Sequence, residues 1–194
     1  MKDVSCIILA GGKSKRMGRD KKFLLLNGRS FLEIAVDNGR ALSSEVIISL
    51  GTEEQRDEVL ARGFDVVTVI DNVKQKGPLA GLCTALEKCT KEYVVVLPCD
   101  TPLISREIIY SLLENCEGWD AVVPVVRDFP EPLIAVYRVE SLQRACREAI
   151  KAGTWKVGEV IKKLEKIKYY PMDTRCFLNV NTPQDMEEVR RHGR

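Results

Sequence analysis

Apolar runs recur along the chain, separated by segments with helical spacing of apolar positions. Residues 4–10 form a run that is apolar apart from Ser5 and is bounded by Gly11 and Gly12. This pattern is typical of a strand that is covered on both faces of a parallel sheet. Similar runs predict strands at 45–50, 65–70, 93–97, 120–126, 132–137, 166–170 and 176–180.

The segments between these runs predict helices. Ser30-Phe-Leu-Glu33 and Thr52-Glu-Glu-Gln55 are capping-box patterns, and Thr182-Pro183 is a typical helix start. The alternation of strands and helices predicts an α/β fold with a mostly parallel sheet, in which the strands at 120–126 and 132–137 allow an antiparallel member. The predicted helices cover about 31–41, 53–63, 78–90, 105–116, 139–150 and 157–164, and another begins at 183.

Length and composition indicate one soluble, cytoplasmic domain. The 194 residues, 45% of them hydrophobic, can bury one sizeable core, so a single domain over 1–194 is expected. The seven cysteines form no C-x-x-C pair, which favours reduced core thiols over a zinc site or disulfides. Residues 2–10 lack the features of a signal peptide, and no stretch reaches the length of a membrane span.

Positive charge is concentrated after the first strand. The formal charge of +2 and the pI near 8.1 are too mild for a nucleic-acid surface, but residues 13–22 hold six cations against one carboxylate. Gly11 and Gly12 allow backbone N–H groups to approach phosphates closely. The P-loop spacing is excluded because it would need a glycine at Ile7, and the G-x-G-x-x-G spacing is not present. A phosphate-binding loop and a solvated basic loop both remain open.

Asp100 lies where a ligand site is expected. It follows the strand at 93–97, and ligands of open α/β sheets bind at the carboxyl ends of strands. A lone aspartate suits Mg²⁺, which prefers one or two carboxylates with phosphate oxygens and waters, although a simple turn or cap role is also open. The single histidine, His192, makes a histidine base improbable, so the expected chemistry uses no histidine, and Arg16 and Lys21 are candidates for holding phosphate groups.

The order of motifs resembles a known family. Leu9-Ala-Gly-Gly12 with Arg16-Met-Gly18 and Asp20-Lys21 is similar to the signature loop of nucleotidyltransferases, and Gly77-Pro-Leu-Ala-Gly81, Leu97-Pro-Cys-Asp-Thr-Pro102 and Phe177-Leu-Asn-Val-Asn-Thr-Pro183 resemble later motifs of the molybdenum cofactor guanylyltransferases. The resemblance covers almost the whole chain. It implies a three-layer, Rossmann-like, MobA-like nucleotidyltransferase fold and Mg²⁺-dependent transfer of GMP from GTP to the molybdenum cofactor.

The resemblance also implies roles for individual residues. Arg16, Lys21 and Asp100 would be catalytic, Asp100 would bind Mg²⁺, and Asn179 and Asn181 would face the molybdopterin acceptor. It further implies molybdoenzymes or cofactor-biosynthesis proteins as partners, with no nucleic acid and no membrane. The residues implied to bind GTP are Leu9, Ala10, Gly11, Gly12, Lys21, Asp71, Gly77, Pro78, Leu79 and Asp100.

The chain also departs from the family pattern. Ser49-Leu50-Gly51 stands where the family often has an asparagine, and Lys22 beside Lys21 leaves open which lysine dominates. Guanylyl transfer to another phosphorylated acceptor, such as adenosylcobinamide phosphate, is an alternative, as is a non-catalytic nucleotide-binding module. Nucleic-acid binding by the basic loop is disfavoured because the loop has no aromatic residues for base stacking.

Overall fold

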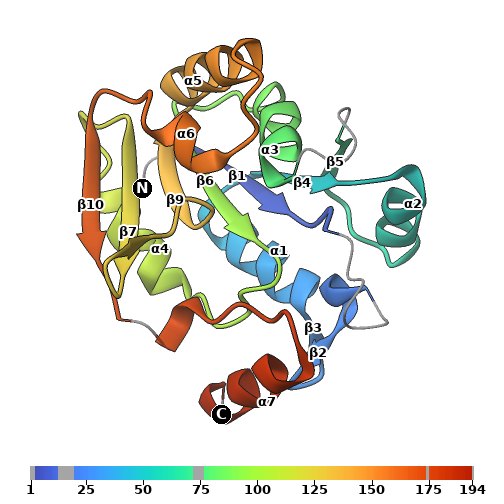
Figure 1. Ribbon diagram of the computed structural model, residues 1–194. Coiled ribbons are helices and arrows are strands. Elements are labelled where there is room, and N and C mark those ends of the chain that lie inside the picture. The colour runs from blue at the N-terminus through green and yellow to red at the C-terminus, as the bar shows by residue number, and fades with distance from the viewer. Residues whose placement is uncertain (1–2, 13–19, 72–76, 174, 194) are drawn as a thin grey trace.

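The computed structural model describes residues 3–12, 20–71, 77–173 and 175–193. Within them the central sheet has the strand order β10-β7-β9-β6-β1-β4-β5, with β8 paired to β7 (Figure 1). Strands β6, β1, β4 and β5 are parallel neighbours and β9 runs antiparallel to β6 and β7, which confirms a mostly parallel sheet with an antiparallel member. The strands are β1 (Val4–Leu9), β4 (Glu45–Leu50), β5 (Val67–Ile70), β6 (Tyr93–Pro98), β7 (Ala121–Val126), β8 (Phe129–Pro130), β9 (Ala135–Arg138) and β10 (Ile167–Pro171).

Helices cover both faces of this sheet. Helices α1 (Phe31–Leu42) and α4 (Arg106–Glu114) pack in one hydrophobic cluster, and α3 (Pro78–Leu86), α5 (Val139–Lys151) and α6 (Val157–Ile161) pack in another on the opposite face (Figure 1). Helix α2 (Glu53–Ala61) contacts β4 and β5 and buries Val59. The predicted α/β fold of three layers is therefore confirmed. No helix in the described part of the chain is long and apolar enough to cross a membrane.

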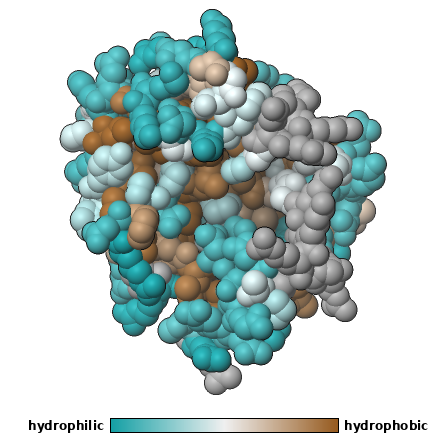
Figure 2. All heavy atoms as spheres, in the orientation of Figure 1, coloured by the Kyte–Doolittle hydropathy of each residue, from teal (hydrophilic) through white to brown (hydrophobic). Residues whose placement is uncertain are grey.

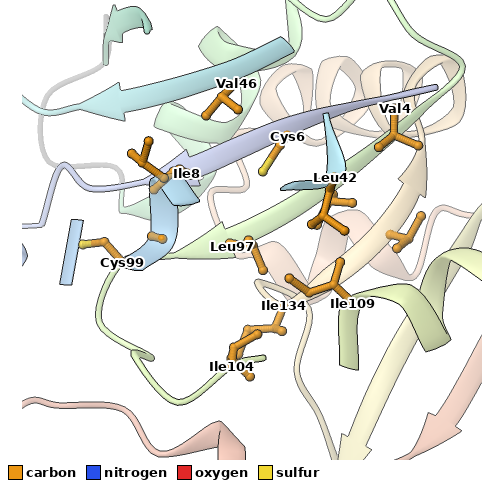
Figure 3. Packing of buried hydrophobic residues seen from close by; sticks show 14 of the residues in the cluster. Val4, Cys6, Ile8, Leu42, Val46, Leu97, Cys99, Ile104, Ile109 and Ile134 are labelled. Atoms are coloured by element: carbon orange, nitrogen blue, oxygen red, sulfur yellow. The ribbon is translucent and has the colours of Figure 1, made fainter. Parts of the chain in front are cut away.

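The first strand shows why the apolar runs are continuous. Val4, Cys6 and Ile8 belong to the cluster with α1 and α4, where Ile109 also lies (Figure 3), whereas Ile7 belongs to the cluster with α3 and α5. All five of these side chains are fully buried. A strand that is covered on both faces has no solvent side that would call for alternating polar residues.

The end of the chain returns to its beginning. Helix α7 (Pro183–His192) packs through Met186 and Val189 against Leu26 and Phe31, next to the small hairpin of β2 (Leu25–Leu26) and β3 (Arg29–Ser30). Figure 1 shows α7 beside this hairpin, below the main sheet. The packing brings the segment before α7 close to the 3₁₀ helix η1 (Lys21–Phe23).

The predicted strand at 176–180 is wrong. Residues 175–177 form a second 3₁₀ helix, η2 (Arg175–Phe177), and the following residues join no strand. Phe177 is buried in the cluster with α1 and α4, whereas Val180 is buried in the cluster with α7. These apolar residues therefore connect two cores instead of lining one face of a sheet.

Several predicted boundaries and contacts also differ. The strand expected at 132–137 begins at Ala135, because residues 131–134 form a turn in which Ile134 N donates to Glu131 O at 3.1 Å. The hairpin of β2 and β3, and strand β8, were not predicted. The capping box at Ser30 and Glu33 is formed, but at Thr52 only the cap itself forms, because the Gln55 side chain binds elsewhere.

Candidate active site

A cavity of about 520 Å³ opens at the carboxyl ends of β1, β4 and β6. Leu9, Leu50 and Pro98, the last residues of these strands, line it. In the sheet, β1 lies between β4, the next strand of the chain on one side, and β6, a later strand on the other side. The cavity therefore lies at the point where the strand order reverses. Figure 2 shows apolar side chains in the middle of this face of the molecule, between hydrophilic regions.

Two glycines make close backbone contact at the cavity wall. A Cβ added to Gly11 would lie 2.8 Å from Gly51 N, and a Cβ added to Gly51 would lie 2.7 Å from Gly11 O. Neither position has room for a side chain, so the backbone itself lines the cavity here. A Cβ added to Gly12 would meet no atom of the described residues within 4 Å, and Gly12 also lines the cavity.

Helix α3 begins at another wall of the cavity. Gly77 adopts a positive φ of 74°, and Pro78 occupies the first turn of the helix. Both residues line the cavity, so the N–H groups and the positive dipole end of α3 lie beside it. The Leu79 side chain is instead buried in the core, so any contact from Leu79 to a nucleotide would have to use its backbone.

Lys21 joins residues from distant parts of the chain. Its Nζ donates to Asn181 Oδ1 at 2.6 Å and lies 3.9 Å from Asp100 Oδ2. Val180 N also donates to Asp100 O at 2.9 Å, which ties the late segment to the end of β6. A cation, a carboxylate and an amide thus meet in one group at the cavity.

Burial sets the electrostatics of this group. The Asp100 side chain is 29% exposed, and this burial raises the pKa of its carboxyl, while the nearby Lys21 opposes that rise. The neighbouring Cys99 also lines the cavity, but burial and the charge of Asp100 raise the pKa of its thiol to about 12. Cys99 is therefore protonated at neutral pH and is not a nucleophile.

The MobA-like NTP transferase domain matches residues 6–167. The chain belongs to this family. A molybdenum cofactor guanylyltransferase from Syntrophotalea carbinolica is 34% identical over 202 residues, covering 100% of this chain and 93% of that protein. A probable molybdenum cofactor guanylyltransferase from Natranaerobius thermophilus is 29% identical and covers 98% and 96% of the two chains.

Solved structures of related proteins have the same fold. Molybdopterin-guanine dinucleotide biosynthesis protein A from Archaeoglobus fulgidus superposes with a TM-score of 0.80 at 25% identity, covering 97% of each chain. The 2-C-methyl-D-erythritol 4-phosphate cytidylyltransferase from Thermus thermophilus superposes with a TM-score of 0.75 at 21% identity, covering 97% and 98% of the chains. At this identity the second likeness concerns the fold alone.

The MobA-like fold brings most of the predicted site residues into one cavity. Asn181 reaches it through Lys21, whereas Asn179 is exposed and Leu79 is buried. Arg16 lies outside the described residues. The predicted residues that line the cavity are Leu9, Ala10, Gly11, Gly12, Lys21, Asp71, Gly77, Pro78 and Asp100.

Other residues of the cavity wall were not predicted as site residues. Gly51 and Thr52 follow β4, and Leu133 lies in the turn before β9. The signal that could have found the first two is their position directly after the predicted strand at 45–50, because ligands of open α/β sheets bind at the carboxyl ends of strands. Ser49, which stands where the family often has an asparagine, also lines the cavity.

The donor chemistry at Asp100 fits Mg²⁺. Asp100 offers carboxylate oxygens at a cavity wall, and no group of three or more His, Cys, Asp or Glu residues in the described ranges could hold a metal by itself. Mg²⁺ usually binds one or two carboxylates and completes its shell with substrate phosphates and water. A site of this kind needs a bound nucleotide to supply the remaining oxygens.

Proposed function

We propose that this protein transfers GMP from GTP to the terminal phosphate of the molybdopterin in the molybdenum cofactor and releases pyrophosphate. The observation that carries the proposal is the meeting of Lys21, Asp100 and Asn181 beside the glycine-lined cavity. Relatives that carry the name molybdenum cofactor guanylyltransferase and align over nearly the full chain support the choice of nucleotide and acceptor.

The residues of the chain suit a direct transfer between phosphates. The acceptor phosphate is already anionic, so it needs positioning and charge stabilisation more than a general base. An acceptor oxygen forms the new bond to the α-phosphorus, and the bond to the bridging oxygen of pyrophosphate breaks, with pyrophosphate keeping the electron pair. Lys21, Arg16 and the backbone N–H groups of the glycine loop would bind the phosphate oxygens. When bound at Asp100, Mg²⁺ would add positive charge against the phosphates.

The test is turnover with defined nucleotides and acceptors. Radiolabelled GTP or CTP is incubated with Mg²⁺ and molybdopterin, and pyrophosphate release is measured. The proposal expects release with GTP and molybdopterin. Release only with another acceptor, such as adenosylcobinamide phosphate, would contradict the acceptor, and binding without any release would indicate a non-catalytic module.

The nucleotide preference gives a separate prediction. We expect GTP with Mg²⁺ to bind roughly tenfold or more tightly than CTP or ATP, because a mismatched base leaves buried polar groups unpaired at a cost of about 1–3 kcal/mol each. Isothermal titration calorimetry with the three nucleotides measures this. Equal affinities for all three would contradict a guanine-specific site.

The acceptor side gives another prediction. Asn179→Ala should raise the KM for molybdopterin and leave GTP affinity nearly unchanged, whereas Asn181→Ala should affect both ligands because its Oδ1 holds Lys21. The turn before α7 is capped by Thr182 and Asp185, so neither amide side chain is needed for that cap. Steady-state kinetics with each ligand varied, together with melting temperatures, test this. An Asn179→Ala protein that melts early and loses both ligands equally would refute the acceptor role.

The same function suggests where the protein works. We infer a cytoplasmic enzyme whose product is used by molybdoenzymes, with those enzymes or other proteins of cofactor biosynthesis as partners. Co-purification of the tagged protein with molybdoenzymes from a cytosolic extract tests this inference.

A further inference from the structure

Two adjacent lysines at the cavity have different partners. Lys21 reaches Asn181 and Asp100, whereas the side chain of Lys22 has no exposed surface. Lys22 Nζ is paired with Asp20 Oδ2 and lies 5.0 Å from the centre of the Phe23 ring. A fully buried ammonium is costly unless a counter-charge accompanies it, so Asp20 is the partner that allows Lys22 to be buried.

Asp20 in turn connects separate parts of the cavity wall. Its Oδ2 also accepts from Gln55 Nε2 at 3.3 Å, and Gln55 Oε1 accepts from Gly51 N at 2.9 Å. Gly51 is the residue that packs directly against Gly11. Asp20 also caps η1, the 3₁₀ turn that carries Lys21. One carboxylate therefore links the position of Lys21 to the contact between the two glycines.

The position of Asp20 poses an electrostatic problem for a nucleotide site. Asp20 lines the cavity, and its side chain is 25% exposed. A nucleoside triphosphate is strongly anionic, and like charges at close range repel each other strongly when poorly solvated. An uncompensated carboxylate in this wall would oppose nucleotide binding.

We propose that Lys22 is a positioning residue of the nucleotide site, whose buried charge neutralises Asp20 in the cavity wall. Asp20 can then hold Gln55, Gly51 and the Lys21 turn in place without repelling the phosphates. The inference rests on the proposed nucleotide binding and adds a division of labour between the two lysines. Lys21 acts on the ligand, and Lys22 acts on the protein.

The test compares Lys22→Met with the double variant Asp20→Asn, Lys22→Met. Calorimetry measures the affinities for GTP with Mg²⁺ and for uncharged guanosine. Lys22→Met should weaken GTP binding by about tenfold or more, because Asp20 keeps its negative charge, and should change guanosine binding little. The double variant should recover most of the GTP affinity, because replacing both members of a buried ion pair by neutral groups is often tolerated.

The outcomes separate this inference from the proposed function. Lys151→Met, at the exposed end of α5, is the matched control and should bind GTP like the unmodified protein. If the unmodified protein bound no nucleotide, the proposed function would fail together with the inference. If it bound GTP but Lys22→Met bound equally well, or if the double variant stayed as weak as the single one, the inference alone would be overturned.

The double variant also decides the case in which Lys22→Met does not fold. GTP affinity near that of the unmodified protein in the folded double variant would support neutralisation of Asp20. A folded double variant that had lost GTP affinity would show that Lys22 contributes more than its charge against Asp20, which overturns the inference. Equal losses for GTP and guanosine in Lys22→Met would likewise overturn it, because charge repulsion acts on the phosphates and not on the nucleoside.

Discussion

Asp100→Asn is expected to lower kcat by about 100-fold or more while the protein stays folded, which is the order of loss when one electrostatic partner of a transition state is removed. Asp100 lies in the turn just after the central strand β6, at the cavity wall, and its Oδ2 is 3.9 Å from Lys21 Nζ. Asparagine has nearly the same shape but no charge to hold Mg²⁺. The measurement is pyrophosphate release across a range of Mg²⁺ concentrations.

The stability of the Asp100→Asn protein provides the control. Burial raises the pKa of the Asp100 carboxyl, so the native state pays to ionise this group near neutral pH. A neutral amide removes that cost, and the backbone bond from Val180 N to Asp100 O does not depend on the side chain. We therefore expect a melting temperature equal to or above that of the unmodified protein. A folded variant with full activity at every Mg²⁺ concentration would show that Asp100 is not the metal ligand.

Most strands and helices could be predicted, because a strand that is buried on both faces has a continuous apolar run and a helix has apolar residues at helical spacing. The run over β1 is continuous because Ile7 and Ile8 face two different cores, and that run was visible in the sequence. The segment at 176–180 is also rich in apolar residues, but it is not a strand. Phe177 and Val180 each enter a different core, and apolar composition alone does not distinguish this from a strand.

The candidate site could be predicted as a set of motifs but not as a geometry. The resemblance implied that Lys21 and Asp100 act on the nucleotide and that Asn181 faces the acceptor. The structure brings all three together, and their roles in binding stay predictions. The sequence did not show which of Lys21 and Lys22 would reach Asp100 and which would be buried with Asp20. That difference depends on the orientation of η1 in the folded chain. The side chain of Gln55 reaches Asp20 and Gly51 instead of completing the capping box, and this too depends on tertiary contacts.

Lys21→Met is the other substitution for which we expect a large effect. It removes the cation that contacts Asp100 and Asn181 at the cavity. This positive charge is expected to stabilise the negative charge that develops on the departing pyrophosphate. We expect kcat/KM for GTP to fall by about 100-fold or more, with a loss of nucleotide affinity as well as of kcat. Steady-state kinetics with GTP varied, together with calorimetric binding of GTP, separate the two contributions.

Two comparisons distinguish Lys21 from its neighbour. Lys21→Arg keeps the charge, so it should retain more GTP affinity than Lys21→Met, although the guanidinium cannot reproduce the single close contact with Asn181 and kcat should still fall. Asp100→Asn should not rescue Lys21→Met, because both residues are expected to act on the ligand, whereas Asp20→Asn should rescue Lys22→Met. Full kcat and full GTP affinity in a folded Lys21→Met protein would refute the assignment of Lys21 as a phosphate-binding residue.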